Sequence, residues 1–268
     1  MNLRSLYWHT YLIGYVLVGS LIILWIRMTK KDKHVRREHL HQIEKRWAAR
    51  MVAASGSNVT VIHKTSLKQG VNYVFFANHQ SSFDIFTLMA YAKPPVVFMS
   101  KPLYFKIPIF GRAMKDMGHF SIDRKNRRQA LIDIARAQEA ILTGNLSLII
   151  FPEGTRSLAG TIGTFKTGPL RILVPHQQTL ADSDSKHLTS LSPHHATIKL
   201  SAIKIIPTAI VNTRQIQKKG SLRIYPAHVK LIFGNPLTIK PHMLTGNAKQ
   251  GLMKRIENIV RDLHTSHS

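Results

Sequence analysis

The chain has 268 residues, of which 44% are hydrophobic, so it is long enough for one large domain or two small ones with a substantial core. Its 38 Lys and Arg residues outnumber 13 Asp and Glu residues, and the formal net charge of +25 indicates an anionic partner: nucleic acid, a phospholipid surface or a phosphorylated substrate. The absence of cysteine excludes a disulfide scaffold, a thiolate nucleophile and Cys-ligated metal sites.

Residues 1–28 are apolar enough to form a transmembrane or membrane-inserted helix. No Asp, Glu, Lys or Arg occurs between Ser5 and Ile26. As a helix rising about 1.5 Å per residue, this stretch reaches about 33 Å, against a hydrocarbon core about 30 Å thick. A secretory signal is the alternative, but no small-residue cleavage site follows. Basic residues are frequent in the next ten positions, which predicts that the rest of the chain lies on the cytoplasmic face, at the inner membrane if the protein is bacterial.

Residues 29–57 are predicted to form a basic amphipathic segment at the membrane interface. Apolar residues occur at helix-like spacing among basic ones between Lys33 and Ala54, as expected for a helix on an anionic phospholipid surface. An ordinary solvated helix packed on the following domain is an equally good interpretation. Nucleic acid is a less favoured partner for this segment, because phospholipid headgroups are the nearer polyanion beside an apolar anchor.

Residues 58–268 are predicted to form an α/β domain, because short β-rich runs alternate with helical patterns. Strands are expected at 59–63, 73–77, 96–99, 146–151, 203–211 and 228–233, and helices at 127–142 and 249–263. Asn126 is available as an N-cap and Gly144 as a stop for the first of these helices. The polar segment at about 176–201 is predicted to be an inserted surface loop.

A polar motif, Asn78-His-Gln-Ser-Ser-Phe-Asp84, follows the predicted strand at 73–77. It puts His79 at the carboxyl end of a strand, where α/β sheets place their sites. If Asp84 lies in the first turn of the following helix, its carboxylate can fold back onto the imidazole and let His79 take a proton from a hydroxyl. The alternative, which the spacing alone favours, is that Asp84 caps the helix and His79 makes an ordinary surface hydrogen bond.

A second motif, Phe151-Pro-Glu-Gly-Thr-Arg-Ser157, follows an apolar strand. Gly154 permits close approach of the backbone to a ligand, and Arg156 can bind a phosphate with two hydrogen bonds. Glu153 can hold this arginine or a substrate hydroxyl. The alternative is a tight turn closed by a Glu153–Arg156 salt bridge.

Two further basic residues follow β-like runs: Lys101 comes after 96–99, and Arg124 comes after another such run. Both can point to the sheet edge that carries His79, where three cations from separate loops would make a phosphate pocket. Each of them alone is more often a solvated surface charge. The apolar residues between them, such as Ile107 and Ile109, suit either an acyl-chain pocket or ordinary core.

Taken in order, the segments 78–84, 101–124, 151–157 and 206–210 resemble the four blocks of the glycerolipid acyltransferase family. The likeness is greatest to 1-acyl-sn-glycerol-3-phosphate acyltransferases and covers about residues 60–215. It implies a mixed, largely parallel sheet flanked by helices.

The resemblance also implies a reaction and the residues that perform it. In this family His79 would deprotonate the sn-2 hydroxyl of lysophosphatidate with support from Asp84, and the oxygen would attack an acyl thioester of coenzyme A or acyl carrier protein to give phosphatidate. No bound cofactor and no metal are expected. The implied phosphate-binding residues are Lys101, Arg124 and Arg156, and the implied substrate-binding loop is Glu153, Gly154 and Thr155.

Two departures from the family pattern leave the acceptor open. Pro102 stands where the family often has a Glu, and the segment 175–202 is longer than usual. Glycerol 3-phosphate or another lysophospholipid is therefore an alternative acceptor.

Two hypotheses from other functional classes compete with the acyltransferase hypothesis. A membrane-tethered nucleic-acid-binding protein would explain the charge, but the chain has no recognisable nucleic-acid-binding signature, so no nucleic acid is expected as a partner. A metal-dependent phosphatase using His79 and Asp84 would need further acidic ligands near these motifs.

Overall fold

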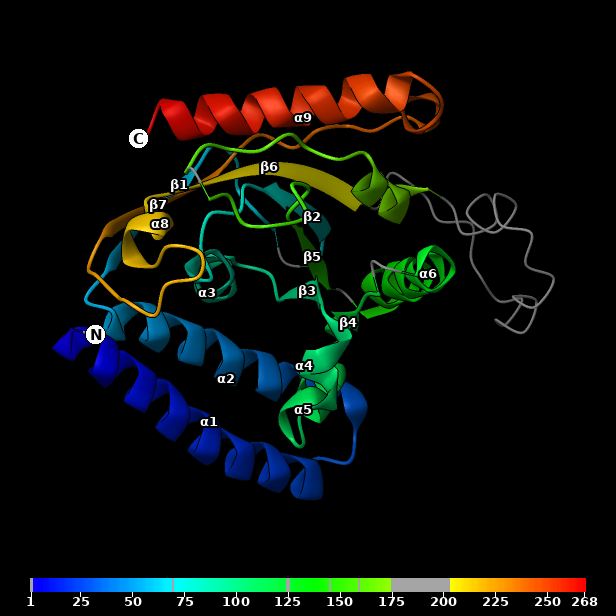
Figure 1. The fold of residues 1–268 in the computed structure, drawn as a ribbon. Coiled ribbons are helices and arrows are strands. Elements are labelled where there is room, and N and C mark those ends of the chain that lie inside the picture. Colours follow the sequence, from blue (N-terminus) through cyan, green and yellow to red (C-terminus); the bar gives the residue numbers. More distant parts are fainter. Residues whose placement is uncertain (1, 69, 124–125, 145, 159, 175–202) are drawn as a thin grey trace.

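The computed structural model describes residues 2–268 except 69, 124–125, 145, 159 and 175–202. Arg124 and the predicted loop at 176–201 therefore lie outside the described residues. The described part of the chain forms one seven-stranded sheet with helices on both faces (Figure 1).

The sheet is mixed and largely parallel, as the family resemblance implied. Its strand order is β1-β7-β6-β2-β5-β3-β4, and every neighbouring pair is parallel except β6 and β7. The strands are β1 (Asn58–His63), β2 (Asn72–Ala77), β3 (Val96–Ser100), β4 (Phe120–Ser121), β5 (Ser147–Ile150), β6 (Ile203–Val211) and β7 (His228–Phe233). All six strands with stated ranges are present, with ends within a few residues of the prediction.

The helices include all those expected and three short ones that were not. They are α1 (Leu3–Thr29), α2 (Lys33–Ala54), α3 (Phe83–Tyr91), α4 (Pro102–Lys106), α5 (Phe110–Met117), α6 (Arg127–Gly144), α8 (Thr213–Ile216) and α9 (Ala248–Thr265), with 3-10 helices at Gly168–Leu173 and Pro241–Leu244. Asn126 caps α6 as predicted, because its Oδ1 accepts a hydrogen bond from the N–H of Gln129 at 3.0 Å. The unpredicted helices α4, α5 and α8 are too short to show a periodic pattern.

Both faces of the central strands are buried. Because successive side chains of a strand point to opposite faces, Tyr73 and Phe75 of β2 pack in the cluster that contains residues of α2 and α3. Val74 and Phe76 pack in the other cluster, with residues of α6 and α9. Figure 1 shows α9 on one side of the sheet and α2 and α3 on the other. Since neither face of the central strands is open to solvent, a substrate can reach the sheet only at the ends of its strands.

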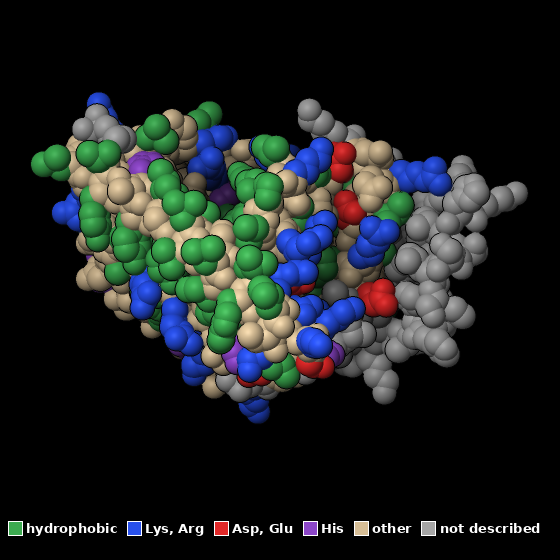
Figure 2. All heavy atoms as spheres, turned by 90° about the horizontal axis from the view of Figure 1, so that it is seen from below, with side chains coloured by type: hydrophobic (Ala, Val, Ile, Leu, Met, Phe, Trp, Pro, Cys, Tyr) green, Lys and Arg blue, Asp and Glu red, His purple; other side chains and the backbone are tan. Residues whose placement is uncertain are grey.

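The helices α1 and α2 form an antiparallel pair at one side of the domain (Figure 1). Among the described residues, α1 is the one helix long and apolar enough to cross a membrane, and only 6% of its most apolar window is buried. It contacts the domain through Trp8, whose indole N–H donates to the carbonyl of Met51 at 2.8 Å. Figure 2, seen from the side of α1, shows many hydrophobic side chains exposed on this face.

The helix α2 packs on the domain, which was one of the two interpretations of its sequence. Its buried residues include Leu40, Glu44, Ala48 and Val52, which repeat every four positions and form one face of the helix. This face carries a carboxylate as well as apolar groups, so the helix has no clear division into apolar and basic sides. Its role at a membrane interface stays a prediction.

Candidate active site

The two sequence motifs meet at the carboxyl ends of neighbouring strands. The motif with His79 follows β2 and the motif with Arg156 follows β5, and these strands are adjacent and parallel. The N–H of Ser157 donates to the carbonyl of His79 at 3.0 Å. On the other side, the Asn78 amide exchanges two hydrogen bonds of 2.8 Å with the backbone of Ile210 in β6. The turn after β2 is therefore held from both sides.

Asp84 lies in the first turn of α3 and folds back onto His79, in the geometry expected from the sequence. Its Oδ2 is 2.8 Å from Nδ1 of His79 and also accepts hydrogen bonds from the N–H groups of Gln80 and Ser81, at 2.7 and 2.8 Å. Its Oδ1 accepts a hydrogen bond from the Thr213 hydroxyl. The carboxylate is completely buried. Among the described residues, no group of three or more His, Asp or Glu side chains is placed to hold a metal ion, whereas the metal-dependent phosphatase hypothesis needs further acidic ligands near these motifs.

The imidazole of His79 is fixed in place but open to a substrate. Its ring stacks on Phe151, with centroids 4.1 Å apart and planes 18° apart. Since Nδ1 faces the Asp84 carboxylate, we assign the ring proton to Nδ1, which leaves the lone pair of Nε2 free. The side chain is 15% exposed, so a small part of the ring reaches the surface.

Glu153 binds backbone groups of the site. One carboxylate oxygen accepts from the N–H of His79 at 2.6 Å and the other accepts from the N–H of Gly163 at 2.8 Å. Burial raises the pKa of this carboxyl group. Among the described residues no ion pair joins Glu153 to Arg156, so the salt bridge considered for this turn is not formed.

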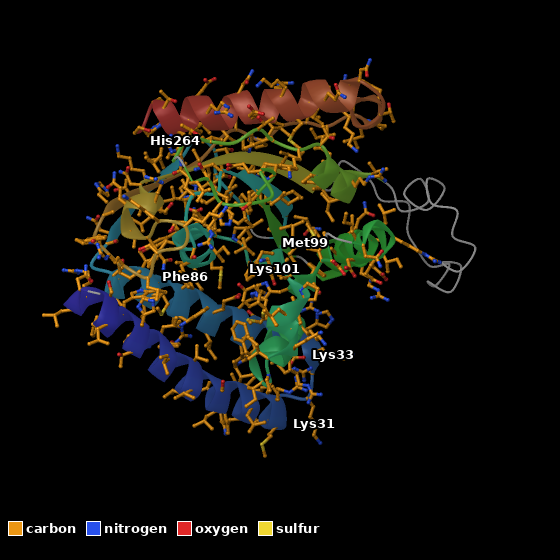
Figure 3. The ribbon with its side chains drawn as sticks, in the orientation of Figure 1. Lys31, Lys33, Phe86, Met99, Lys101 and His264 are labelled. Carbon is orange, nitrogen blue, oxygen red and sulfur yellow. The ribbon has the colours of Figure 1, made fainter. Side chains whose placement is uncertain are left out.

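Two of the three predicted phosphate-binding residues, Arg156 and Lys101, are described by the structure and follow strands that end at the same sheet edge. Arg156 donates to the hydroxyl of Ser82 at 2.7 Å and is partly exposed. Lys101 is exposed at the start of α4, after β3, and Figure 3 shows it between α3 and α4. The strands β2, β5 and β3 are consecutive in the sheet, so the residues that follow them share one edge.

The other two residues of the predicted substrate-binding loop lie in the turn after β5. Gly154 has a φ of +76°, a conformation that favours glycine, and Thr155 is exposed.

Two residues of the site were missed by the sequence analysis. Thr213 binds Asp84 across 129 positions of the chain. Lys219 donates from Nζ to the Thr155 hydroxyl at 3.0 Å and to the carbonyl of Arg156 at 2.9 Å. Both follow β6, in the stretch just after the fourth resembling block. Their position after a strand was the only available signal, and it did not single them out.

Comparisons with known proteins agree with this geometry. A family model described as "Acyltransferase" matches residues 58–211, more than half of the chain. A 1-acyl-sn-glycerol-3-phosphate acyltransferase of Cocos nucifera is 29% identical over 164 residues, covering 61% of this chain and 45% of that protein. The enzyme of the same name from Escherichia coli strain K12 is 34% identical over 119 residues, covering 44% of this chain and 49% of that protein. The chain thus matches about half the length of these curated relatives.

A solved structure has the same fold. The crystal structure of the 1-acyl-sn-glycerophosphate (LPA) acyltransferase from Thermotoga maritima superposes with a TM-score of 0.74, covering 97% of this chain and 92% of that chain at 23% identity. At this identity the likeness concerns the fold.

Proposed function

The chain belongs to the acyltransferase family, and on that premise we propose that it transfers an acyl group to the sn-2 hydroxyl of 1-acyl-sn-glycerol 3-phosphate, forming phosphatidate. The donor is an acyl thioester of coenzyme A or acyl carrier protein. The observation that carries this proposal is the hydrogen bond between His79 and the buried carboxylate of Asp84, which leaves one imidazole nitrogen open at the sheet edge.

The chemistry needs one proton acceptor and no covalent acyl-enzyme. His79 Nε2 takes the proton of the acceptor hydroxyl while its oxygen attacks the thioester carbon. The imidazolium that forms is stabilised by the Asp84 carboxylate at 2.8 Å. When the tetrahedral intermediate collapses, the carbon–sulfur bond breaks and the leaving thiolate takes the proton from His79. The ester is then complete and the imidazole is neutral again.

The acceptor phosphate is assigned to the basic residues at the same edge. Arg156 is held by Ser82, which lies in the turn that carries His79, so a phosphate on Arg156 is close to the base. Lys219 holds the backbone of the same loop and adds positive charge beside it. Lys101 lies two strands from β2 and suits the same phosphate from the other side. Glu153 acts by positioning the backbone of His79.

The oxyanion of the tetrahedral intermediate needs hydrogen-bond donors. Backbone N–H groups near a helix start are natural candidates for this role. The N–H groups of His79, Gln80 and Ser81 already donate to the carboxylates of Glu153 and Asp84. The oxyanion donors must therefore come from other groups of the site.

The helix α1 suits attachment to the membrane in which an amphiphilic acceptor resides. It lies along α2, a helix with many charged residues, and not apart from the domain. Because those charges need water or headgroups, we propose that α1 enters one leaflet from the side, with the catalytic domain on the cytoplasmic face. Flotation of the full chain with vesicles and its loss on deletion of residues 2–29 would support this arrangement.

The test of the proposed function is acyl transfer by the purified full chain in detergent micelles containing lysophosphatidate and radiolabelled acyl-CoA. Wild-type protein should form phosphatidate, and His79→Ala and Asp84→Asn should form very little. His242→Ala is the matched control, because His242 is exposed and its side chain forms no hydrogen bond or ion pair with the described residues. Equal product from wild type and His79→Ala would remove His79 from the mechanism.

Replacing lysophosphatidate with glycerol 3-phosphate or another lysophospholipid in the same assay tests the acceptor. Faster turnover of either substitute would assign the chain to that acceptor and leave the reaction type unchanged.

A further inference from the structure

The helices α4 and α5 form a hairpin, and four of its apolar side chains are exposed. Leu103, Tyr104, Ile107 and Ile109 are between 40% and 66% exposed. In the sequence, Ile107 and Ile109 suited either core or an acyl-chain pocket, but the structure puts them on the surface. A group of exposed apolar side chains on one element indicates an interaction surface.

A pocket of about 410 Å³ lies between this hairpin and the C-terminal end of α1. Its apolar lining comes from Leu24 of α1 and from residues 105 and 107–109 of the hairpin. All its other lining residues are basic, namely Arg27, Lys106, Arg112 and Lys115. An apolar lining with basic groups fits a ligand with a hydrocarbon chain and an anionic head.

The positive charge of this pocket is largely uncompensated. None of the residues that line the pocket is acidic, and the neighbouring Asp116 already pairs with Arg27 and lies 3.7 Å from Arg36. Lys106, Arg112 and Lys115 are exposed, and none of them forms an ion pair within the part of the chain that the structure describes. Three like charges beside an apolar surface are stabilised when an anion binds among them.

The pocket is held in shape by packing on its inner side. Ala113 and Met117 of α5 belong to a buried cluster with Ile26 of α1 and Leu40 of α2. The hairpin itself is tight, since a Cβ at Gly111 would lie 2.3 Å from the carbonyl oxygen of Phe105. Ile109 has a φ of +61°, which is rare for a β-branched residue and is kept only where the surroundings fix the backbone.

We propose that this pocket binds an anionic phospholipid of the bilayer, with its phosphate at Lys106, Arg112 and Lys115 and its hydrocarbon chain against the apolar lining. The site is separate from the catalytic one and makes the hairpin a second membrane contact beside α1. Figure 2 shows hydrophobic side chains and Lys or Arg side chains next to each other on the face seen from α1. Figure 3 shows Lys31 and Lys33 where α1 turns into α2, at this same end of the pair.

The test measures vesicle binding of the full chain without substrate. Vesicles of phosphatidylcholine alone are compared with vesicles of phosphatidylcholine containing phosphatidylglycerol, and the ratio of the two binding constants gives the gain from anionic lipid. In the triple variant Lys106→Gln, Arg112→Gln, Lys115→Gln this gain should fall about 100-fold, since each basic residue near an anionic surface contributes about fivefold.

The matched control is Lys64→Gln, Lys68→Gln, Lys93→Gln, which removes the same charge from exposed positions outside the pocket. Its gain from anionic lipid should stay close to that of wild type. An equal loss in both triple variants would overturn the proposal, because general attraction would then explain the binding. No loss in either would also overturn it.

A second measurement separates the pocket from the acceptor site. The pocket variant should keep the wild-type KM for lysophosphatidate in detergent micelles, where no bilayer is present. A raised KM there would make the pocket part of acceptor binding and overturn the proposal. Failure of wild type to transfer acyl groups at all would reject the proposed function but leave the vesicle result standing. In addition, Ile107→Ser should weaken binding to both kinds of vesicle, since it removes apolar contact.

Discussion

Replacing Thr213 by valine tests whether Asp84 needs a donor on both carboxylate oxygens. The Thr213 hydroxyl is the one protein donor to Oδ1 among the described residues, and Asp84 is completely buried, so water cannot replace it without a rearrangement. Leaving a buried charged group without such a partner costs about 1.5–3 kcal/mol. Because Thr213 supports the carboxylate that stabilises the imidazolium, we expect this loss to appear in turnover.

The expected result is a fall in kcat of about tenfold to 100-fold, since each 1.4 kcal/mol corresponds to about tenfold in rate. KM for lysophosphatidate should change little, because Thr213 lies behind Asp84 and is itself buried. The assay is steady-state acyl transfer with the acceptor varied. Thr213→Ser keeps the hydroxyl and should restore most of the rate.

Thr87→Val is the matched control. Thr87 lies one turn after Asp84 in α3 and is also completely buried, and its hydroxyl has no hydrogen-bond partner in the part of the chain that the structure describes. This substitution should leave kcat within about twofold of wild type. A Thr213→Val enzyme that is no slower than this control, or a Thr213→Ser enzyme as slow as the valine variant, would refute the reasoning.

Three further predictions concern two other residues of the site, Glu153 and Lys219, and Glu44, a buried carboxylate of α2. Glu153→Gln should lower kcat about tenfold to 100-fold, because the amide NH₂ would face one of the two backbone N–H groups that now donate to the carboxylate. Glu38→Gln, at an exposed position of α2, is the control. Lys219→Met should raise KM for lysophosphatidate about tenfold in the same kinetic assay, whereas the exposed neighbour in Lys218→Met should not matter. Burial acts to raise the pKa of Glu44, but hydrogen-bonded His119 and His41 lower it to about 2, so its ionised form contributes stability above pH 4.5 that is lost as the pH falls towards 2. By chemical denaturation, wild type should lose about 3 kcal/mol more than Glu44→Gln over this range, and parallel curves for the two proteins would contradict this prediction.

Local sequence patterns determined most of the secondary structure. The apolar run before Phe151 could only be a buried strand or helix segment, and its length favoured the strand that is found as β5. Asn126 capped α6 because a cap depends on a donor three residues away. His79 and Asp84 are five residues apart, so a turn followed by a helix is enough to bring them together. Their meeting was therefore predictable, as a possibility, from the chain itself.

The partners of these residues depended on the tertiary structure. The order of strands in the sheet placed the loop after β5 beside the turn after β2, and this made Glu153 a partner of the His79 backbone and not of Arg156. Thr213 reached Asp84 for the same reason, since β6 lies on the other side of β2. No spacing within the sequence encodes these pairs.

Exposure was also decided only in three dimensions. The sequence established that the chain is basic, that its first helix is apolar, and that its motifs follow strands, because these are properties of composition and of short segments. It could not separate the outward apolar residues of the α4–α5 hairpin from core, nor the buried face of α2 from a face on a membrane. Burial depends on which elements pack against each other, and that is settled by strand order and helix placement over the whole domain.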